Sequence, residues 1–228
     1  DWLTLAGENT NLRILLEELY NHFKDAPILG SLIDPESNLG KGSLFELKWE
    51  EVDSLLEKVL RSERDSIKQE FGVVAKGLNK AARILSQKYS ITITNVPYLA
   101  INRFNDTLRN YVEKNYSSAK NDLAFVFVKR LCSLSESWGL SCFVTTSGWT
   151  FQNRERHFRN EMLANTSWKI MARLGAGAFD AISGEVVQGM LGITSNKKIF
   201  AYFYTIDVSD EGGIERKSSG LKRKEMRQ

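Results

Sequence analysis

The stretch at residues 90–98, Ser-Ile-Thr-Ile-Thr-Asn-Val-Pro-Tyr, constrains the fold of this chain more than any other segment. Its first five residues alternate and are rich in β-branched types, which predicts a strand over residues 90–94. Pro97 has no N–H to donate to a strand ladder, so the strand must end before it. Asn95 and Tyr98 are therefore expected at the carboxyl end of a strand, where open α/β sheets bind their ligands.

An amide beside a fixed aromatic ring suits a flat, hydrogen-bonding ligand such as a nucleobase. Asn95 offers a carbonyl acceptor to an exocyclic amine, and Tyr98 offers a ring face for stacking. The alternative is an ordinary Asn/Pro turn, with Tyr98 as a half-buried core residue. On these residues alone the turn is the better interpretation, and the segments downstream change that balance.

The composition is that of an ordinary globular protein, with 228 residues of which 42% are hydrophobic and 26% charged. No run approaches the ~18 apolar residues of a transmembrane helix, so no membrane partner is expected. Cys132 and Cys142 both lie in apolar runs, which favours free thiols and a cytoplasmic location. Two cysteines, with His22 and His157 far apart in sequence, predict neither a metal site nor a Ser/His site.

The positive charge is concentrated in the later part of the chain. Residues 1–48 hold four Lys/Arg against eight Asp/Glu, whereas residues 90–166 hold nine against six. An excess of three charges is a weak indication of nucleic acid, because solvated helix faces often carry as much. The chain opens on Asp1 rather than Met, which suggests a fragment of a longer protein.

Helical periodicity dominates the chain before residue 90. Apolar spacing predicts helices over residues 10–24, 50–60 and 62–89, with a loop over residues 28–47. An α/β sheet normally alternates strands and helices from its start. Residues 1–89 are therefore expected to be a helical segment inserted in or flanking the sheet domain, whose first strands are absent.

After residue 98 the pattern alternates between helices and strands. Helices are predicted over residues 105–115, 119–134 and 153–165, and strands over residues 140–146 and 168–174. Asp122 is placed to cap the second helix, and Gly139 to end it. Two apolar runs, residues 186–194 and 198–206, predict an antiparallel hairpin. Residues 209–228 form a polar, basic tail that is expected to be flexible.

Gly175-Ala176-Gly177 follows a predicted strand, as the glycines of a dinucleotide-binding loop do. The third glycine and the acidic strand end of that motif are missing. A tight turn is therefore the better interpretation.

Four blocks in this order resemble the catalytic half of adenine-N6 DNA methyltransferases, above all those of BREX phage-defence systems and combined type II restriction–methylation enzymes. The blocks are Asn-Val-Pro-Tyr at 95–98, Tyr-Ser-Ser-Ala-Lys-Asn-Asp-Leu at 116–123, Phe-Val-Thr-Thr-Ser-Gly-Trp at 143–149, and Leu-Gly-Ala-Gly-Ala-Phe-Asp-Ala-Ile-Ser-Gly-Glu-Val-Val at 174–187. The resemblance covers roughly residues 85–206. It implies an α/β fold, in which residues 90–208 form the C-terminal, catalytic half of a Rossmann-like methyltransferase sheet.

The resemblance implies S-adenosylmethionine as cofactor, double-stranded DNA as partner, and other phage-defence subunits as further partners. It assigns catalysis to Asn95, Val96, Pro97 and Tyr98: the Asn95 side chain and the Val96 carbonyl accept the amino hydrogens of a flipped adenine, and Tyr98 stacks on it. Asp122 is a candidate for the cofactor side, with a simple helix cap as the equal alternative. Trp149 is a candidate pocket wall, although a core tryptophan needs no function.

Two departures from the family pattern bear on activity. Val96 replaces the first proline of Asn-Pro-Pro-Tyr, which keeps the carbonyl and loses some rigidity. The family's glycine-rich cofactor loop, an acidic strand leading into Phe-x-Gly-x-Gly, does not occur before residue 90. The isolated chain is therefore expected to be inactive, and two alternatives stay open: a non-catalytic DNA-binding or scaffold module, and methylation of a protein glutamine.

Overall fold

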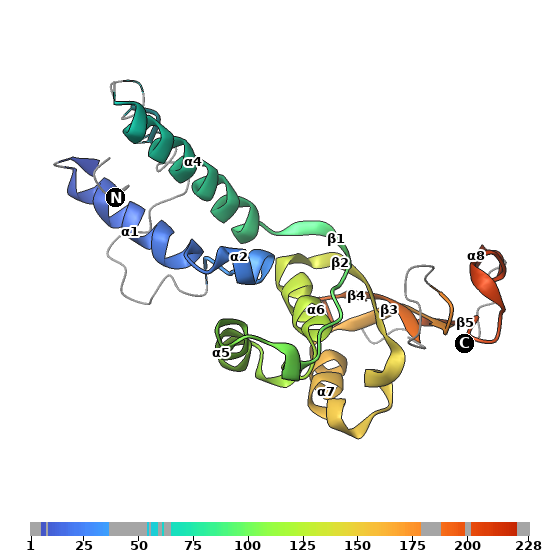
Figure 1. Ribbon diagram of the computed structural model, residues 1–228. Coiled ribbons are helices and arrows are strands. Elements are labelled where there is room, and N and C mark those ends of the chain that lie inside the picture. The colour runs from blue at the N-terminus through green and yellow to red at the C-terminus, as the bar shows by residue number, and fades with distance from the viewer. Residues whose placement is uncertain are drawn as a thin grey trace. The chain divides into compact units, whose positions relative to one another are not determined.

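The computed structural model (Figure 1) divides into two compact units, residues 1–87 and 88–228, which are described separately. The structure describes residues 6–7, 9–36, 54, 56–58, 61, 65–178, 188–198 and 202–222. Within these residues no helix is both long and apolar enough to cross a membrane.

The described part of the first unit is helical, with α1 (Thr10–Phe23), α2 (Ala26–Leu29), η2 (Gly30–Leu32) and α4 (Ser66–Ser86). Side chains of Asn9 and Asp65 cap α1 and α4 by accepting hydrogen bonds from Leu12 N and Ile67 N. The helices predicted over residues 10–24 and 62–89 are confirmed. The predicted loop begins instead as helical turns, α2 and η2. Its residues 37–47, and most of the helix predicted over residues 50–60, lie outside the described residues.

The second unit holds a five-stranded sheet in the order β1-β2-β4-β3-β5. Its strands are β1 (Tyr89–Asn95), β2 (Ser135–Thr146), β3 (Ser167–Gly175), β4 (Gly189–Ser195) and β5 (Tyr204–Asp207). β1 pairs parallel with β2, whereas β4 runs antiparallel between β2 and β3. The predicted α/β class is confirmed, as are the strands predicted at residues 90–94, 140–146 and 168–174.

The hairpin predicted from residues 186–194 and 198–206 is wrong in its pairing. β4 is hydrogen-bonded on both sides, to β2 and β3, so neither of its edges is available to β5. β5 instead adds parallel to the outer edge of β3. Tyr202 and Phe203 precede β5 outside any strand and are exposed, so the apolar run at 198–206 misled the prediction. Residues 186–187 and 199–201 of this prediction lie outside the described residues.

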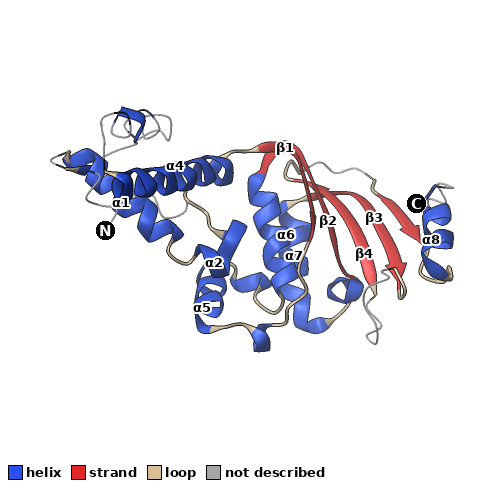
Figure 2. Ribbon diagram, turned by 45° about the horizontal axis from the view of Figure 1, so that its top comes forward, coloured by secondary structure: helices blue, strands red, loops and turns tan. Residues whose placement is uncertain are grey.

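Helices α6 (Leu123–Leu134) and α7 (Arg156–Asn165) lie on one face of the sheet, and α5 (Asp106–Asn115) precedes them in the chain (Figure 2). The core on this face is aromatic. Phe125 of α6 stacks on Phe158 of α7 with ring centroids 5.0 Å apart, and Phe143 of β2 meets Trp168 of β3 edge-on. Burial of these large rings stabilises the contact between the helices and the sheet.

Two expectations are wrong, one about the residue that ends α6 and one about the C-terminal tail. Gly139 does not cap α6; the helix ends at Leu134, and Gly139 lies within β2, where a Cβ would meet Tyr89 O at 2.7 Å.

The tail is not irregular throughout, because residues Gly213–Lys222 form helix α8. Lys217 of α8 is buried, and its ammonium donates to the carbonyls of Leu174, Val208 and Ser209. These three hydrogen bonds hold α8 to the end of the sheet, which composition could not predict. Residues 223–228 lie outside the described residues.

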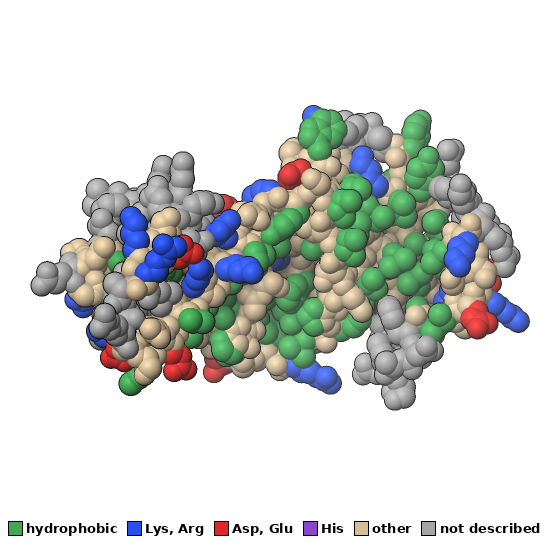
Figure 3. Space-filling model, turned by 90° about the horizontal axis from the view of Figure 1, so that it is seen from above, with side chains coloured by type: hydrophobic (Ala, Val, Ile, Leu, Met, Phe, Trp, Pro, Cys, Tyr) green, Lys and Arg blue, Asp and Glu red, His purple; other side chains and the backbone are tan. Residues whose placement is uncertain are grey.

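β1 is an edge strand, because among the described strands it has a neighbour only on the β2 side. Its Thr92 is buried beneath the helices, whereas Ile91 and Ile93 point the other way and are 59% and 76% exposed. Figure 3 shows hydrophobic side chains gathered over the strands on the face that it presents. Among the described residues, the sheet is therefore covered by α6 and α7 on one face, whereas its other face carries exposed hydrophobic side chains such as Ile91 and Ile93.

Candidate functional site

Asn95 is the last residue of β1 and lies opposite Val144 of the parallel strand β2. Because the two strands are parallel, the segment after Asn95 and the turn after Thr146 emerge at the same edge of the sheet. Asn95 is exposed, whereas the side chain of Val96 is buried, at 3% exposure. Val96 therefore anchors the segment and leaves the Asn95 amide free to face a ligand.

The segment beyond Tyr98 is fixed to the start of α6 by a short antiparallel bridge between Ala100 and Asp122. Leu123 N donates to Leu99 O at 2.9 Å, and Ile101 N donates to Asn121 O at 3.1 Å. These bonds join residues far apart in sequence, so the position of Asn95 to Tyr98 is set at both ends, by the strand and by this bridge.

Tyr98 is half-buried, and its hydroxyl is buried without a hydrogen-bond partner among the described residues. Burial raises the pKa of the Tyr98 hydroxyl above its usual value, and the neighbouring Asp122 carboxylate raises it further. The phenol therefore stays neutral at physiological pH.

Asp122 is the N-cap of α6. Its Oδ1 accepts from Ala124 N at 2.9 Å and, more weakly, from Leu99 N at 3.4 Å. Burial raises the pKa of the Asp122 carboxyl above its ordinary value, outweighing these hydrogen bonds, which act in the opposite direction. The cap predicted from the sequence is confirmed, whereas a role on the cofactor side stays a prediction.

We expect Asp122→Asn to keep the stability of the chain at neutral pH, because asparagine caps helices as well as aspartate does. Because the pKa of the Asp122 carboxyl is higher in the folded chain than in the unfolded chain, the free energy of unfolding decreases as the pH rises through the interval between these two pKa values. Asparagine does not titrate, so the Asp122→Asn variant should not show this decrease. Asp122→Ala should cost about 1 kcal/mol by loss of the cap. Thermal unfolding from acidic to neutral pH measures both effects.

The matched control is Asn105→Ala, which removes the uncharged cap of α5, where Asn105 Oδ1 accepts from Leu108 N at 2.9 Å. It should cost a similar amount at every pH. An Asp122→Asn variant that is as unstable as Asp122→Ala would contradict the capping role.

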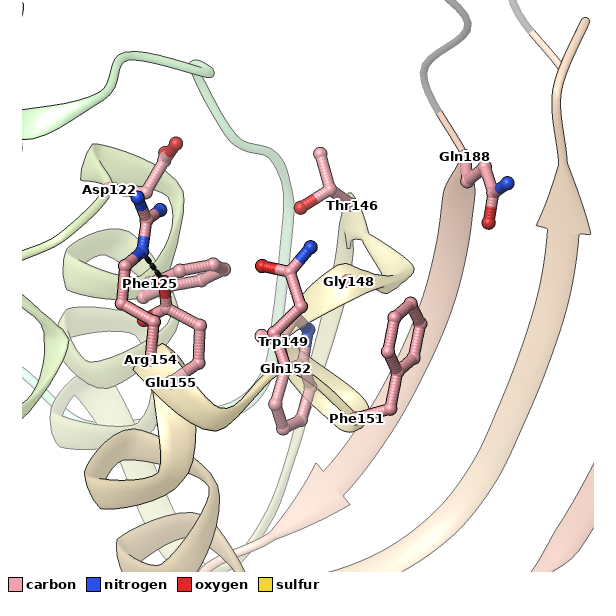
Figure 4. A pocket seen from close by; sticks show the side chains of 10 residues that line it. All are labelled: Asp122, Phe125, Thr146, Gly148, Trp149, Phe151, Gln152, Arg154, Glu155 and Gln188. Atoms are coloured by element: carbon pink, nitrogen blue, oxygen red, sulfur yellow. Dashed lines mark hydrogen bonds and ion pairs between the residues drawn. The ribbon is translucent and has the colours of Figure 1, made fainter.

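A cavity of about 550 Å³ opens at this edge of the sheet. Figure 4 shows the ten residues around it, which come from the start of α6, the end of β2, the turns that follow β2 and the position just before β4. They are Asp122, Phe125, Thr146, Gly148, Trp149, Phe151, Gln152, Arg154, Glu155 and Gln188. Of the residues predicted from the sequence, Asp122 and Trp149 line the cavity, whereas Asn95, Val96, Pro97 and Tyr98 do not. Asp122 is the residue that connects the cavity to the Asn95–Tyr98 segment.

The polar wall of the cavity is built around Glu155, whose side chain is 1% exposed. Its carboxylate accepts from Arg154 Nε at 2.8 Å and from Asn121 Nδ2 at 3.0 Å. Sequence reasoning missed this residue, because it treated Glu155 only as part of the helix predicted over residues 153–165. An Arg next to a Glu is common on exposed helix faces, so no pattern in the sequence indicated that Glu155 is buried.

Trp149 is almost fully buried, at 2% exposure, in the 3-10 turn η5 (Ser147–Thr150). Its indole Nε1 donates to Thr145 Oγ1 at 3.1 Å, and its ring packs against Phe158 and Trp168. Arg159 holds the turn from outside by donating to Trp149 O at 2.8 Å. Trp149 thus has a clear role in the core, and a role as a wall toward substrate stays a prediction.

The glycine turn after β3 is tight, as predicted. Gly175 and Gly177 have φ values of 69° and 68°, which favour glycine. A Cβ on Gly175 would meet Ser209 at 2.7 Å, so the space behind this turn is filled by the chain itself. The last residues of the fourth matching block, 179–187, lie outside the described residues.

Residues 4–179 match the Eco57I restriction-modification methylase family. The chain belongs to this family. The match includes the helices of the first unit as well as the Asn95–Tyr98 segment, and the resemblance inferred from the sequence is confirmed.

Two relatives of this Eco57I-type chain carry names that describe an activity. It is 31% identical over 202 residues to the adenine-specific methyltransferase PglX of Lacticaseibacillus casei, and 30% identical over 179 residues to the adenine-specific methyltransferase BrxX of Escherichia coli. These matches cover 84% and 75% of this chain but 16% and 15% of the relatives. The chain thus spans about a sixth of their length.

Among solved structures, the chain is similar to the ATP-dependent Type ISP restriction-modification enzyme LlaBIII, determined bound to DNA. The TM-score is 0.51 at 13% sequence identity, over 72% of this chain and 13% of that chain. At this identity the likeness shows a shared fold.

Proposed function

We propose that this chain carries the target-base half of the active site of a DNA adenine-N6 methyltransferase in a phage-defence or restriction system. The placement of Asn95 carries the proposal. In a member of the Eco57I methylase family, it is an exposed amide at the carboxyl end of β1, in a segment fixed by the pairing of β1 with β2 and by the bridge between Ala100 and Asp122. The names of the two relatives, both adenine-specific methyltransferases, support the same reaction.

The proposed chemistry uses hydrogen-bond acceptors and needs no covalent nucleophile. The Asn95 side-chain oxygen and the Val96 carbonyl accept the two amino hydrogens of an adenine flipped out of the duplex. These contacts turn the nitrogen lone pair out of conjugation with the ring, and they stabilise the positive charge that develops on the nitrogen. Because the Val96 side chain is buried, its backbone has little freedom to move its carbonyl away from this position.

Tyr98 would hold the adenine by stacking, a contact worth about 1–3 kcal/mol in single-base sites. Its hydroxyl is buried, so the exposed part of the residue is not its polar end. The cavity beside Asp122, which bridges to Ala100 of the same segment, would receive the base or a neighbouring nucleotide. Phe151, which is 65% exposed at the cavity, offers a second ring surface there.

S-adenosylmethionine would supply the electrophilic methyl group. The described residues fit this cofactor only in part, because the acidic strand and glycine-rich loop that hold it in the family are not found in this sequence, and the Gly175 turn is filled by Ser209. Asp122 is the one predicted cofactor contact, and it already caps α6. We place double-stranded DNA, and other subunits of a defence system, as partners in the same proposal.

The test is methyl transfer by the complete gene product from labelled S-adenosylmethionine to duplex DNA, with the modified base identified by mass spectrometry. N6-methyladenine is the expected product. DNA binding without transfer would support the non-catalytic module instead, and label recovered in protein would support glutamine methylation.

We expect the 228-residue chain alone to bind S-adenosylmethionine weakly or not at all, because it has no glycine-rich loop to hold the cofactor. Calorimetric titration with excess cofactor should give no saturable heat. Affinity in the micromolar range would show that the 228-residue chain already forms a complete cofactor site.

A further inference from the structure

A second, smaller hollow of about 230 Å³ lies next to the cavity beside Asp122. It is lined by two serines, an asparagine and three basic side chains, with no acidic residue among them: Ser117, Ser118, Lys120, Asn121, Arg154 and His157. Such a set of hydrogen-bond donors, with an arginine and a lysine among them, favours an anion.

The acidic residues around this hollow already have partners. Glu155 accepts from Arg154 and Asn121, and Glu161 pairs with Lys129 at 2.8 Å and with the Ser118 hydroxyl. By contrast, the side chains of Lys120 and His157 are exposed and have no hydrogen-bond or ion-pair partner within the described ranges. The hollow therefore has an ammonium group and an imidazole that no other side chain engages within the described ranges.

The start of α7 adds to this preference. His157 lies in its first turn, and no side chain caps the ten-residue helix. The positive end of the helix dipole at this terminus also attracts an anion.

Arg154 lines both this hollow and the larger cavity beside Asp122. The space proposed for the base and the hollow suited to an anion are therefore adjacent. A nucleotide joins a flat base to a phosphate across a short distance. We propose that Lys120, Arg154 and His157 bind a phosphodiester of the DNA strand beside the flipped adenine. This inference rests on the proposed function, since it takes DNA as the ligand.

The test is the salt dependence of binding to a fluorescent DNA duplex, measured by anisotropy for wild type and Lys120→Ala. Loss of one phosphate contact lowers the slope of log K against log salt by about 0.9, and we expect Lys120→Ala to show this decrease. Lys114→Ala, which removes an exposed lysine of α5 outside the hollow, is the matched control and should keep the wild-type slope. Lys120 is exposed, so its truncation should not affect folding.

In the complete gene product, Lys120→Ala should raise the KM for DNA and leave kcat unchanged, because a phosphate contact is made equally in the ground and transition states. Equal slopes for Lys120→Ala and Lys114→Ala would overturn the phosphate site and leave the proposed methyltransferase intact. If wild type binds no DNA even at low salt, the proposed DNA substrate and this inference both fail. Titration with inorganic phosphate then shows whether the hollow takes a free anion instead.

Discussion

Asn95→Ala should lower methyl transfer to adenine by about 10²–10³-fold in the complete gene product, with the melting temperature and DNA affinity nearly unchanged. Its acceptor is needed chiefly as charge develops on the nitrogen, and the loss of one such transition-state contact has an effect of about this size. Asn95 is exposed at a strand end, so truncation opens no cavity in the core. Incorporation of labelled methyl groups, with thermal unfolding alongside, measures both quantities.

Two variants of neighbouring residues separate the components of this site. Tyr98→Ala should weaken capture of the base by the stacking contribution, whereas Tyr98→Phe should be tolerated, because the Tyr98 hydroxyl has no partner within the described residues. Val96→Pro should also retain activity: the carbonyl remains, and Asn95 is already in the extended conformation that a following proline requires.

Asn160→Ala removes another exposed amide, from α7, and serves as the control that should change neither activity nor stability. Full activity of Asn95→Ala would contradict the adenine site. Loss of activity only through unfolding would mean that the segment is an ordinary turn.

Trp149→Ala should destabilise the second unit by about 3–5 kcal/mol, the range observed when a buried aromatic side chain is truncated to alanine. The indole packs with its ring centroid 5.1 Å from that of Phe158 and 5.7 Å from that of Trp168, and it is hydrogen-bonded to Thr145. Denaturant unfolding gives the change in the free energy of unfolding.

The control for this prediction is Trp138→Ala. Trp138 is 64% exposed, and its ring lies under the Lys197 ammonium, 3.4 Å from the centroid. Its loss should cost at most about 1 kcal/mol. A Trp149→Ala variant as stable as Trp138→Ala would show that the packing around Trp149 contributes little, and would favour the role of Trp149 as a wall for substrate.

Local patterns in the sequence predicted the elements of the fold better than their pairing. Alternation at residues 90–94 and the cap at Asp122 depend on neighbouring residues alone, and both were predicted correctly. The position of β4 between β2 and β3 depends on contacts between segments far apart in the chain, so an apolar run followed by three polar residues was taken for a hairpin. Gly139 misled for the same reason, because its role is to let β2 approach Tyr89 rather than to end a helix.

The candidate site was predicted in part. The sequence placed Asn95 and Tyr98 at a strand end and Asp122 at a helix start, but it did not indicate that a bridge at Ala100 joins them. It also gave no sign that Glu155 is buried or that Arg154 lies between two hollows. Burial of a charged side chain is decided by partners that tertiary structure brings close, such as Asn121, and a short window of sequence does not contain them.

The free edge of β1 has a consequence for how this site can be reached. Among the described strands β1 pairs only with β2, so its other edge presents backbone groups to which a further strand can add, about 4.8 Å away and beside Asn95. A strand that paired there would extend the floor on which the base is held, next to the exposed Asn95 amide.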